Sequence, residues 1–374
     1  MTPLHRDSGV PLYTQVSEIL LQRILSGEWP PGASLPAEPE LCTEFGVARG
    51  TLRQALSKLE SQGYLRRERG RGTFVADRDA RARSQGSSRS QIGFIVPYVR
   101  DSFIPEILLG VERAAAEREL SVTFKHVEND FQRQGEVLET LAEQGLAGVV
   151  LYPVDSVHIE PMKRLTAARY PLVLVDRYLR GVPTDYVMSD HFGGAMQVMQ
   201  HLIELGHQRI GFVSWRDPAV SMEHRRAGYV QALAEAQIPL DMGVMCEVEG
   251  YPTVDLNSSQ QFLVDHPDLT AVFAANDQIA LALYQAARKV GVRIPHDLAL
   301  VGFDNLDFTM HLDVPLTTVE QPAFDIGWRA VETLFARIKD PSRPRQQVIV
   351  PTQLVVRRSC GAYLKVSQPA DNAP

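Results

Sequence analysis

The chain has 374 residues, of which 44% are hydrophobic and 22% charged, and its formal net charge is −7. This length and composition predict two or three folded domains and exclude a fibrous or wholly disordered protein. No apolar run approaches 18 residues and the first residues lack a signal-peptide pattern, so we expect a cytoplasmic protein with no membrane partner. The dispersed cysteines Cys42, Cys246 and Cys360 argue against a disulfide framework and against a zinc site.

The charge is divided unevenly along the chain. Residues 1–90 hold 13 basic and 10 acidic side chains, whereas residues 91–374 hold 25 and 35. Within residues 49–90 the basic side chains outnumber the acidic ones by 11 to four. A basic segment on an acidic protein is typical of one module that contacts nucleic-acid phosphates, although a solvated charged face has the same composition.

The first predicted helix covers residues 12–25, because Val16, Leu20 and Ile24 recur on one face. Two further helices follow, and Gly46 is suited to the left-handed backbone of the tight turn between them. The second of these helices carries three leucines at helical spacing: Leu52, Leu56 and Leu59. Two short strands, at residues 64–67 and 72–75, complete a winged helix-turn-helix.

Polar and basic side chains lie on the helix away from these leucines, where a recognition helix meets the major groove. The turn between the two short strands is also basic. The predicted DNA-contacting residues are Arg49, Thr51, Arg53, Gln54 and Lys58 on the helix, and Arg69, Gly70 and Arg71 in the wing. The predicted partner is double-stranded DNA.

Residues 11–76 closely resemble the DNA-binding domain of the GntR family. The segments that carry the resemblance are Pro11-Leu-Tyr-Thr-Gln15, Gly27 to Pro36, Glu38-Pro-Glu-Leu41, Gly46 to Leu56 and Gly70 to Val75. The resemblance implies that Arg49, Thr51, Arg53 and the wing around Gly70 touch an operator.

Short apolar runs alternate with helical patterns from residue 91 to about residue 364, which predicts an α/β domain with parallel sheets in two lobes. We expect the first lobe to comprise about 91–189 plus 321–340, and the second about 190–320 plus 345–364. The other predicted segments are a winged helix-turn-helix domain at 1–76, a flexible linker at 77–90 and a disordered tail at 365–374.

Polar side chains follow several of the predicted strands, where ligands bind in open α/β sheets. Asp101 and Phe103 follow one strand, Arg177 a second, Asn276 a third and Asp304 a fourth. Carboxylates beside the planar donor groups of Arg and Asn suit vicinal hydroxyls. An aromatic face, from Phe103 or from Tyr251, would cover the ring of a sugar. A single Asp after a strand is more often a helix cap, but several in one domain favour a site.

Residues 91 to about 364 resemble the effector-binding core of the lactose and galactose repressor family, which shares its fold with periplasmic sugar-binding proteins. The segments that carry the resemblance are Thr184 to Asp190, His201 to Ile210, Arg225 to Tyr229, Ala274 to Ala280, Ile294 to Asp304 and Pro315 to Gln321. The resemblance implies a ligand cleft lined by Asp101, Phe103, Arg177, Arg225, Asn276 and Asp304, with Gln321 as a further candidate. A GntR-type head on this core resembles the arabinose-responsive repressor type.

The sequence therefore predicts a ligand-responsive repressor that binds its operator as a homodimer and is released by a small carbohydrate. A regulator that senses a nucleoside or purine as corepressor or activator is the alternative. A transport-type sugar-binding module and a pyridoxal-phosphate enzyme are more remote. We predict no enzymatic activity, cofactor or metal site, because no catalytic spacing is present.

Overall fold

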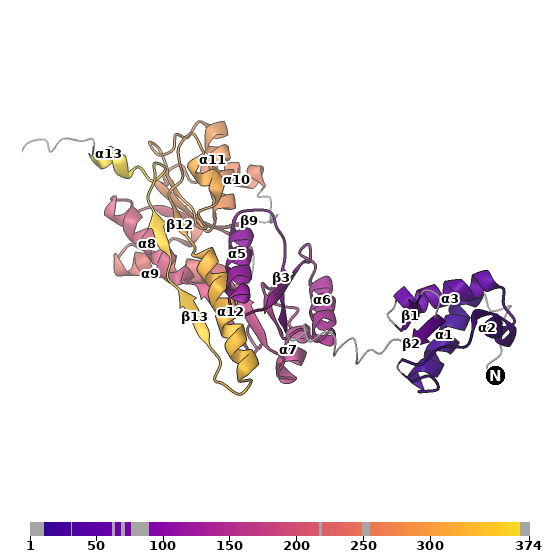
Figure 1. The fold of residues 1–374 in the computed structure, drawn as a ribbon. Coiled ribbons are helices and arrows are strands. Elements are labelled where there is room, and N and C mark those ends of the chain that lie inside the picture. The colour runs from indigo at the N-terminus through magenta and orange to yellow at the C-terminus, as the bar shows by residue number, and fades with distance from the viewer. Residues whose placement is uncertain are drawn as a thin grey trace, which may run out of the picture. The chain divides into compact units, whose positions relative to one another are not determined.

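The computed structural model describes residues 11–30, 32–61, 64–68, 72–75, 90–216, 219–248 and 255–366. Contacts divide the chain into two compact units, Met1–Ser88 and Arg89–Pro374 (Figure 1). The predicted linker, 77–90, lies outside the described residues except for Ser90. The predicted tail, 365–374, is described only for its first two residues.

The first unit is the expected winged helix-turn-helix. Its elements are α1 (Leu12–Leu25), α2 (Glu38–Phe45), α3 (Arg49–Ser61), β1 (Leu65–Glu68) and β2 (Gly72–Val75). Gly46 ends α2 in the left-handed conformation, with φ of 60°. The three leucines of α3 are fully buried against Val16 and Leu20 of α1. Strands β1 and β2 pair antiparallel and form the wing.

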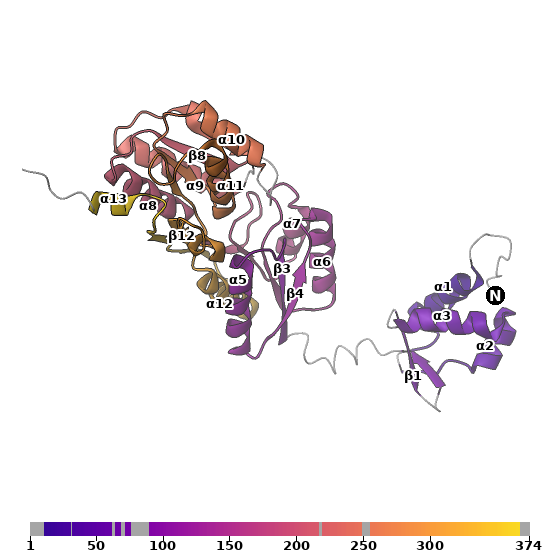
Figure 2. The same ribbon diagram turned by 90° about the horizontal axis from the view of Figure 1, so that it is seen from above.

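The second unit begins with a lobe built on a six-stranded parallel sheet in the order β13-β7-β6-β5-β3-β4. Its strands are β3 (Gln91–Val96), β4 (Ser121–His126), β5 (Gly148–Leu151), β6 (Leu172–Val175), β7 (Asp185–Ser189) and β13 (Gln347–Val350). Its helices are α5 (Phe103–Ala116), α6 (Phe131–Glu143), α7 (Glu160–Ala167) and α12 (Ala323–Lys339). Figure 2 shows α5 and α12 on one face of the sheet and α6 and α7 on the other.

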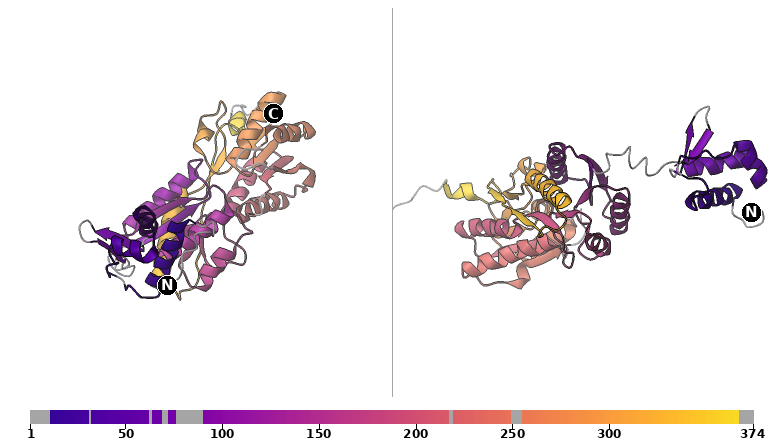
Figure 3. Two further views of the ribbon diagram at one scale, coloured as in Figure 1. Left: turned by 90° about the vertical axis from the view of Figure 1, so that its right-hand side faces the viewer. Right: turned by 60° about the horizontal axis from the view of Figure 1, so that its bottom comes forward.

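The second lobe holds a four-stranded parallel sheet in the order β11-β10-β8-β9. Its strands are β8 (Ile210–Trp215), β9 (Met245–Val248), β10 (Ala271–Ala274) and β11 (Ala299–Val301). Its helices are α8 (His191–Glu204), α9 (Val220–Glu235), α10 (Leu256–Asp265) and α11 (Asp277–Val290), with short 3-10 turns η2 (Met242–Val244) and η3 (Asp307–Met310). Strands β12 (Thr318–Glu320) and β14 (Gln353–Val355) form an antiparallel pair, and α13 (Ala362–Val366) follows (Figure 3).

The α/β class with parallel sheets agrees with the sequence, but one segment was assigned to the wrong lobe. Residues 345–364 were expected in the second lobe, whereas β13 pairs with β7 in the sheet of the first. The reason is that β13 is a half-exposed edge strand, with Gln347 and Ile349 exposed and Val350 buried. Such a short alternating strand fits the edge of either sheet, and only the path of the chain after α12 selects one.

Helices α5 and α12 cross with their backbones in contact. A Cβ atom on Gly327 would lie 2.1 Å from the carbonyl oxygen of Ile107, and one on Gly110 would lie 2.1 Å from that of Phe324. Glycine at both positions therefore lets the two helices share one face of the first sheet. Among the described residues, every helix is too short or too polar to cross a bilayer.

Gly327→Ala should destabilise the second unit by roughly 1–3 kcal/mol, because the added methyl group would collide with the α5 backbone. Urea unfolding followed by tryptophan fluorescence would measure the loss. Arg329→Ala, at an exposed position of the same helix, is the control and should change stability by less than about 0.5 kcal/mol. Equal effects of the two substitutions would contradict the close crossing.

Candidate functional site

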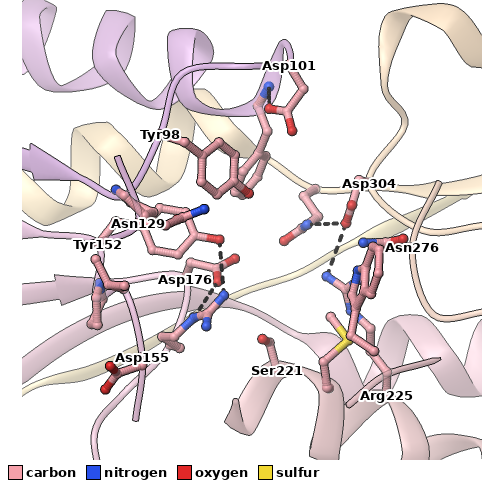
Figure 4. Close-up of a pocket in the computed structure, with 18 of the residues that line it drawn as sticks. Tyr98, Asp101, Asn129, Tyr152, Asp155, Asp176, Ser221, Arg225, Asn276 and Asp304 are labelled. Carbon is pink, nitrogen blue, oxygen red and sulfur yellow. Dashed lines mark hydrogen bonds and ion pairs between the residues drawn. The ribbon is translucent and has the colours of Figure 1, made fainter. Parts of the chain in front are cut away.

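A cavity of about 570 Å³ lies between the two lobes, at the carboxyl ends of their strands. Figure 4 shows carboxylates, arginines and aromatic rings facing one another across it. The first lobe contributes Tyr98, Asp101, Phe103, Asn129, Phe131, Tyr152, Asp155, Asp176 and Arg177. The second lobe contributes Trp215, Arg216, Ser221, Met222, Arg225, Val248, Asn276 and Asp304, and Gln321 follows β12.

The cavity brings together seven of the eight side chains that the sequence singled out as ligand-binding. These are Asp101, Phe103, Arg177, Arg225, Asn276, Asp304 and Gln321. The eighth, Tyr251, lies outside the described residues. Their meeting in one place follows from the topology, because parallel strands carry their carboxyl ends to the same edge of each sheet.

An ion pair between Arg225 and Asp304 forms the second lobe's side of the cavity. Nη2 of Arg225 lies 3.1 Å from Oδ1 of Asp304, and the arginine side chain is only 3% exposed. The guanidinium also lies 3.8 Å from the ring centroid of Phe303 and donates to the carbonyl oxygen of Ala275. Gln321 Nε2 donates to the same carboxylate oxygen, at 2.7 Å. Among the described residues no donor reaches the other oxygen, Oδ2 of Asp304.

Burial raises the pKa of Asp304 to about 7, and the carboxylates of Asp101 and Asp176 add to that rise while Arg225 opposes it. Burial also raises the pKa of Asp101. A hydroxyl that donates a hydrogen bond to Asp304 favours its ionised form. Three carboxylates around one cavity therefore form a strong acceptor set for a ligand with several hydroxyl groups.

His191 holds Arg225 in place. Burial and the charge of Arg225 lower the pKa of His191 to about 3, so the imidazole is neutral. Its Nδ1 then accepts from Nε of Arg225 at 3.3 Å, and its Nε2 donates to the carbonyl oxygen of Asp176 at 3.2 Å. Asp176 follows a strand of the first lobe and His191 opens the first helix of the second, so this chain of contacts connects the lobes.

The first lobe supplies a second guanidinium. Nε of Arg177 donates to Oδ2 of Asp176 at 3.3 Å, and Nη2 donates to the hydroxyl of Tyr152 at 3.4 Å. The guanidinium lies 5.2 Å from the centroid of the Tyr152 ring. Arginine forks thus reach the cavity from both lobes, which suits a ligand with polar groups on two sides.

Two of the cavity's acidic residues have positive φ angles, 66° for Asp176 and 121° for Asp304. Such conformations cost an L-residue roughly 1–3 kcal/mol each and concentrate at functional sites. Asn276 has two roles. Its Oδ1 caps α11 by accepting from the Ile279 amide at 2.9 Å, and its side chain also lines the cavity. A lone polar residue after a strand most often forms a helix cap. Asn276 forms such a cap and is a cavity residue as well.

Sequence reasoning missed His191 and most of the aromatic wall. The wall residues not singled out were Tyr98, Phe131, Tyr152 and Trp215. Tyr98, Tyr152 and Trp215 each lie at or just beyond the end of a predicted strand, and Phe103 was the one aromatic residue selected by that signal. Phe131 opens a helix, and no local pattern pointed to it. Among the described residues, no cluster of three or more His, Cys, Asp or Glu side chains could hold a metal ion.

The other candidate surface is the outer face of α3. Arg49, Arg53 and Gln54 are exposed there, and Thr51 and Lys58 are partly buried. Leu52, Ala55, Leu56 and Leu59 fill the opposite face. The amphipathic pattern therefore leaves the predicted DNA-contacting side chains on solvent.

Near this face, Nε of Arg53 donates to Oε2 of Glu38 at 2.9 Å. The wing strand β1 adds the exposed Arg66 and Arg67, and Arg66 lies 5.4 Å from the ring centroid of Phe74. The predicted wing-tip residues Arg69, Gly70 and Arg71 lie outside the described residues.

Comparison with known proteins accounts for both units. Residues 12–75 match the family model of bacterial regulatory proteins of the gntR family, and residues 199–360 match that of a periplasmic binding protein-like domain. The arabinose metabolism transcriptional repressor of Geobacillus stearothermophilus is 30% identical over 366 residues, which cover 95% of this chain and 99% of that repressor. The chain belongs to this family of transcriptional repressors.

Solved structures resemble the repressor's second unit and part of its first. The transcriptional regulator CelR in complex with cellobiose has a TM-score of 0.66 and 26% identity, and the match covers 87% of this chain and all of that one. A LacI family transcriptional regulator from Enterococcus faecium, solved with bound ribose, has a TM-score of 0.61 and 26% identity over 72% of this chain and 98% of that one.

Replacing Asp304 by Asn should change how the repressor's stability depends on pH. The folded-state pKa of about 7 lies above the ordinary 3.8, so the folded protein keeps a proton that the unfolded chain releases. This stabilising contribution is complete below about pH 4 and is lost as the pH rises to about 7, by at most about 1.4 kcal/mol per pH unit. The unfolding free energy of the wild type minus that of Asp304→Asn should fall over that range in urea titrations. A difference independent of pH would contradict the raised pKa.

Proposed function

We propose that this repressor binds operator DNA through the outer face of α3 and is released when a small carbohydrate occupies the cavity between the lobes. The observation that carries the proposal is the convergence of Asp101, Arg177, Arg225, Asn276 and Asp304 on that one cavity. Because its target would be chromosomal DNA, the protein would act in the cytoplasm. Its proposed action is binding and release of DNA, which needs no catalysis.

The chemistry of the cavity favours a carbohydrate. Carboxylates accept from hydroxyl groups, arginine forks and the Asn276 amide donate to them, and Phe103 and Tyr152 offer flat faces to an apolar ring surface. The cavity volume of about 570 Å³ admits a monosaccharide or a disaccharide. The relatives solved with ribose and with cellobiose, and the arabinose metabolism repressor, support the same class.

Binding would act by closing the lobes around the ligand. Arg180 of the first lobe already forms an ion pair with Glu223 of the second, at the side chains' exposed ends. A ligand held by Arg177 on one side and by the Arg225–Asp304 pair on the other would add contacts that only a closed form makes. In a homodimer, such closure would change the spacing of two recognition helices on a two-fold related operator. A coupling of about 1–3 kcal/mol would change operator affinity about 5–150-fold.

The experiment is a thermal-shift screen followed by operator binding. The full chain would be heated with L-arabinose, D-ribose, cellobiose and adenosine, because a ligand at about 100 times its dissociation constant adds roughly 2.7 kcal/mol of stability. A DNA fragment selected in vitro for binding to the protein would then be titrated with and without each stabilising compound. Stabilisation by a sugar together with weaker DNA binding supports the proposal. Stabilisation by adenosine alone would favour a nucleoside sensor instead.

Arg177→Ala should abolish the carbohydrate-dependent thermal shift and leave affinity for the selected DNA unchanged in the absence of sugar, because Arg177 lines the cavity and belongs to the second unit, whereas α3 belongs to the first. Arg288→Ala is the matched control, since that exposed arginine pairs only with the exposed Asp313 among the described residues. An undiminished shift in Arg177→Ala would remove this side chain from the site.

Arg49→Ala and Gln54→Ala should each weaken binding to the selected DNA by about 1–3 kcal/mol, since side chains at the start of a recognition helix read base edges. Lys58→Ala should weaken binding to all sequences alike and reduce the salt dependence by about one counterion. Gln22→Ala, an exposed position of α1, is the control. Fluorescence anisotropy over a range of salt concentrations measures all four. Normal affinity in both Arg49→Ala and Gln54→Ala would place the DNA on another surface.

A further inference from the structure

A second cavity, of about 470 Å³, lies in the first lobe at the opposite edge of its sheet from the carbohydrate cavity. Its lining residues lie at the end of α7, at the beginnings of β6 and β7, and in the loop that joins α12 to β13. Figure 1 labels α7, α12 and β13. Since β3 runs parallel to β5 and β6, the chain enters the lobe at this same edge. Nothing in the proposed effector response uses this cavity.

One buried ion pair builds the loop that walls the cavity. Nε and Nη2 of Arg337 donate to the two carboxylate oxygens of Asp185, at 2.8 and 3.0 Å. The remaining Nη hydrogens of Arg337 reach the carbonyl oxygens of Pro341, Arg343 and Pro344. The backbone amide of Gln346 donates to Asp185 at 2.6 Å. The loop is thereby held in one conformation, and the charge of Asp185 is compensated.

Three further arginines line the cavity: Arg169, Arg343 and Arg345. Among the described residues none of their guanidinium groups forms a hydrogen bond or an ion pair. Asp185 is the one acidic side chain in the lining. The nearby carboxyl of Asp340 lies outside the lining and accepts from the amide and hydroxyl of Ser342. The charges of Arg337 and Arg343 also help to lower the pKa of Asp340, so this carboxylate offsets part of their charge. The four arginines of the lining still outnumber these two carboxylates, so the cavity has an excess of positive charge.

The other polar groups of the wall already have partners. The hydroxyls of Tyr170, Thr184 and Thr166 donate to backbone carbonyl oxygens. The donors left over are thus the three guanidinium forks, which match the geometry of a tetrahedral oxyanion. Arg169 has a φ of 58° because it occupies the left-handed position that ends α7, where the amide of Tyr170 donates to the carbonyl oxygen of Leu165 at 2.9 Å.

We propose that this arginine cavity binds phosphate groups. Its volume lies in the range of small-molecule sites, and the loop that carries Arg343 and Arg345 is positioned before any ligand arrives. The phosphate could come from a phosphorylated small molecule or from the backbone of DNA. Both sources present negatively charged, non-bridging phosphate oxygens to an arginine fork, and the experiment separates them.

The test adds inorganic pyrophosphate, as the probe, to the full chain. Binding is measured by the broadening of the pyrophosphate resonance in ³¹P NMR spectra. The variant is Arg343→Gln with Arg345→Gln, which leaves Arg337 and Asp185 intact. The matched control is Arg100→Gln with Arg329→Gln, two exposed arginines outside this cavity. We expect the wild type and the control to broaden the resonance equally, and the cavity variant to bind at least about tenfold more weakly. The thermal transition of the second unit reports whether each variant is folded.

DNA titrations of the same proteins at several salt concentrations then show whether the phosphate group belongs to DNA or to a small molecule. If the cavity serves the DNA backbone, the loss of two phosphate contacts should lower the slope of log affinity against log salt by roughly 1.8. An unchanged slope with weaker pyrophosphate binding assigns the cavity to a free phosphorylated molecule. No broadening by the wild type at millimolar pyrophosphate, or equal broadening by the cavity variant and the control, would overturn the proposal.

Discussion

The cavity between the lobes depends on the ion pair of Arg225 and Asp304. Both groups are largely removed from water, and a buried pair of this kind seldom repays its desolvation through mutual attraction alone. It persists because Phe303, His191, Ala275 and Gln321 complete the coordination of both charges. Burial leaves Asp304 with a raised pKa, and among the described residues its Oδ2 has no donor. A ligand hydroxyl that donates to this oxygen would therefore stabilise the complex strongly.

The same network explains how two lobes form one sensor. His191 receives Arg225 on one ring nitrogen and donates to Asp176 of the first lobe with the other. A ligand that changes the position of Arg225 therefore also acts on the segment that carries Arg177. Around this centre the scaffold is stiff: α5 and α12 cross with their backbones in contact, and parallel strands direct the polar side chains to one edge. Strained polar residues at the centre are thus supported by dense packing beneath them, as a preorganised binding site requires.

The two cavities lie at the two ends of one short strand of the first lobe. Leu172, at the start of β6, lines the arginine cavity, and Asp176, just beyond its end, lines the carbohydrate cavity. The strand has four residues, roughly 13 Å at the usual rise per residue. The sheet thus separates the two proposed sites. Carboxylates and arginines both line the cavity at the strand ends, whereas arginines outnumber the single carboxylate in the lining at the strand beginnings.

Local patterns in the chain were sufficient to predict both folds, the buried leucine face of α3 and five cavity residues, because helical and strand periodicities and strand-end positions are properties of neighbouring residues. Two more cavity residues, Arg225 and Gln321, were predicted only from the family resemblance. They were insufficient wherever partners are distant in sequence. The lobe to which β13 belongs, the role of His191 between Arg225 and Asp176, and the grouping of Arg169 with Arg343 and Arg345 all depend on segments many residues apart. Such contacts arise from the folding of the chain through both lobes, and no spacing within a single helix or strand encodes them.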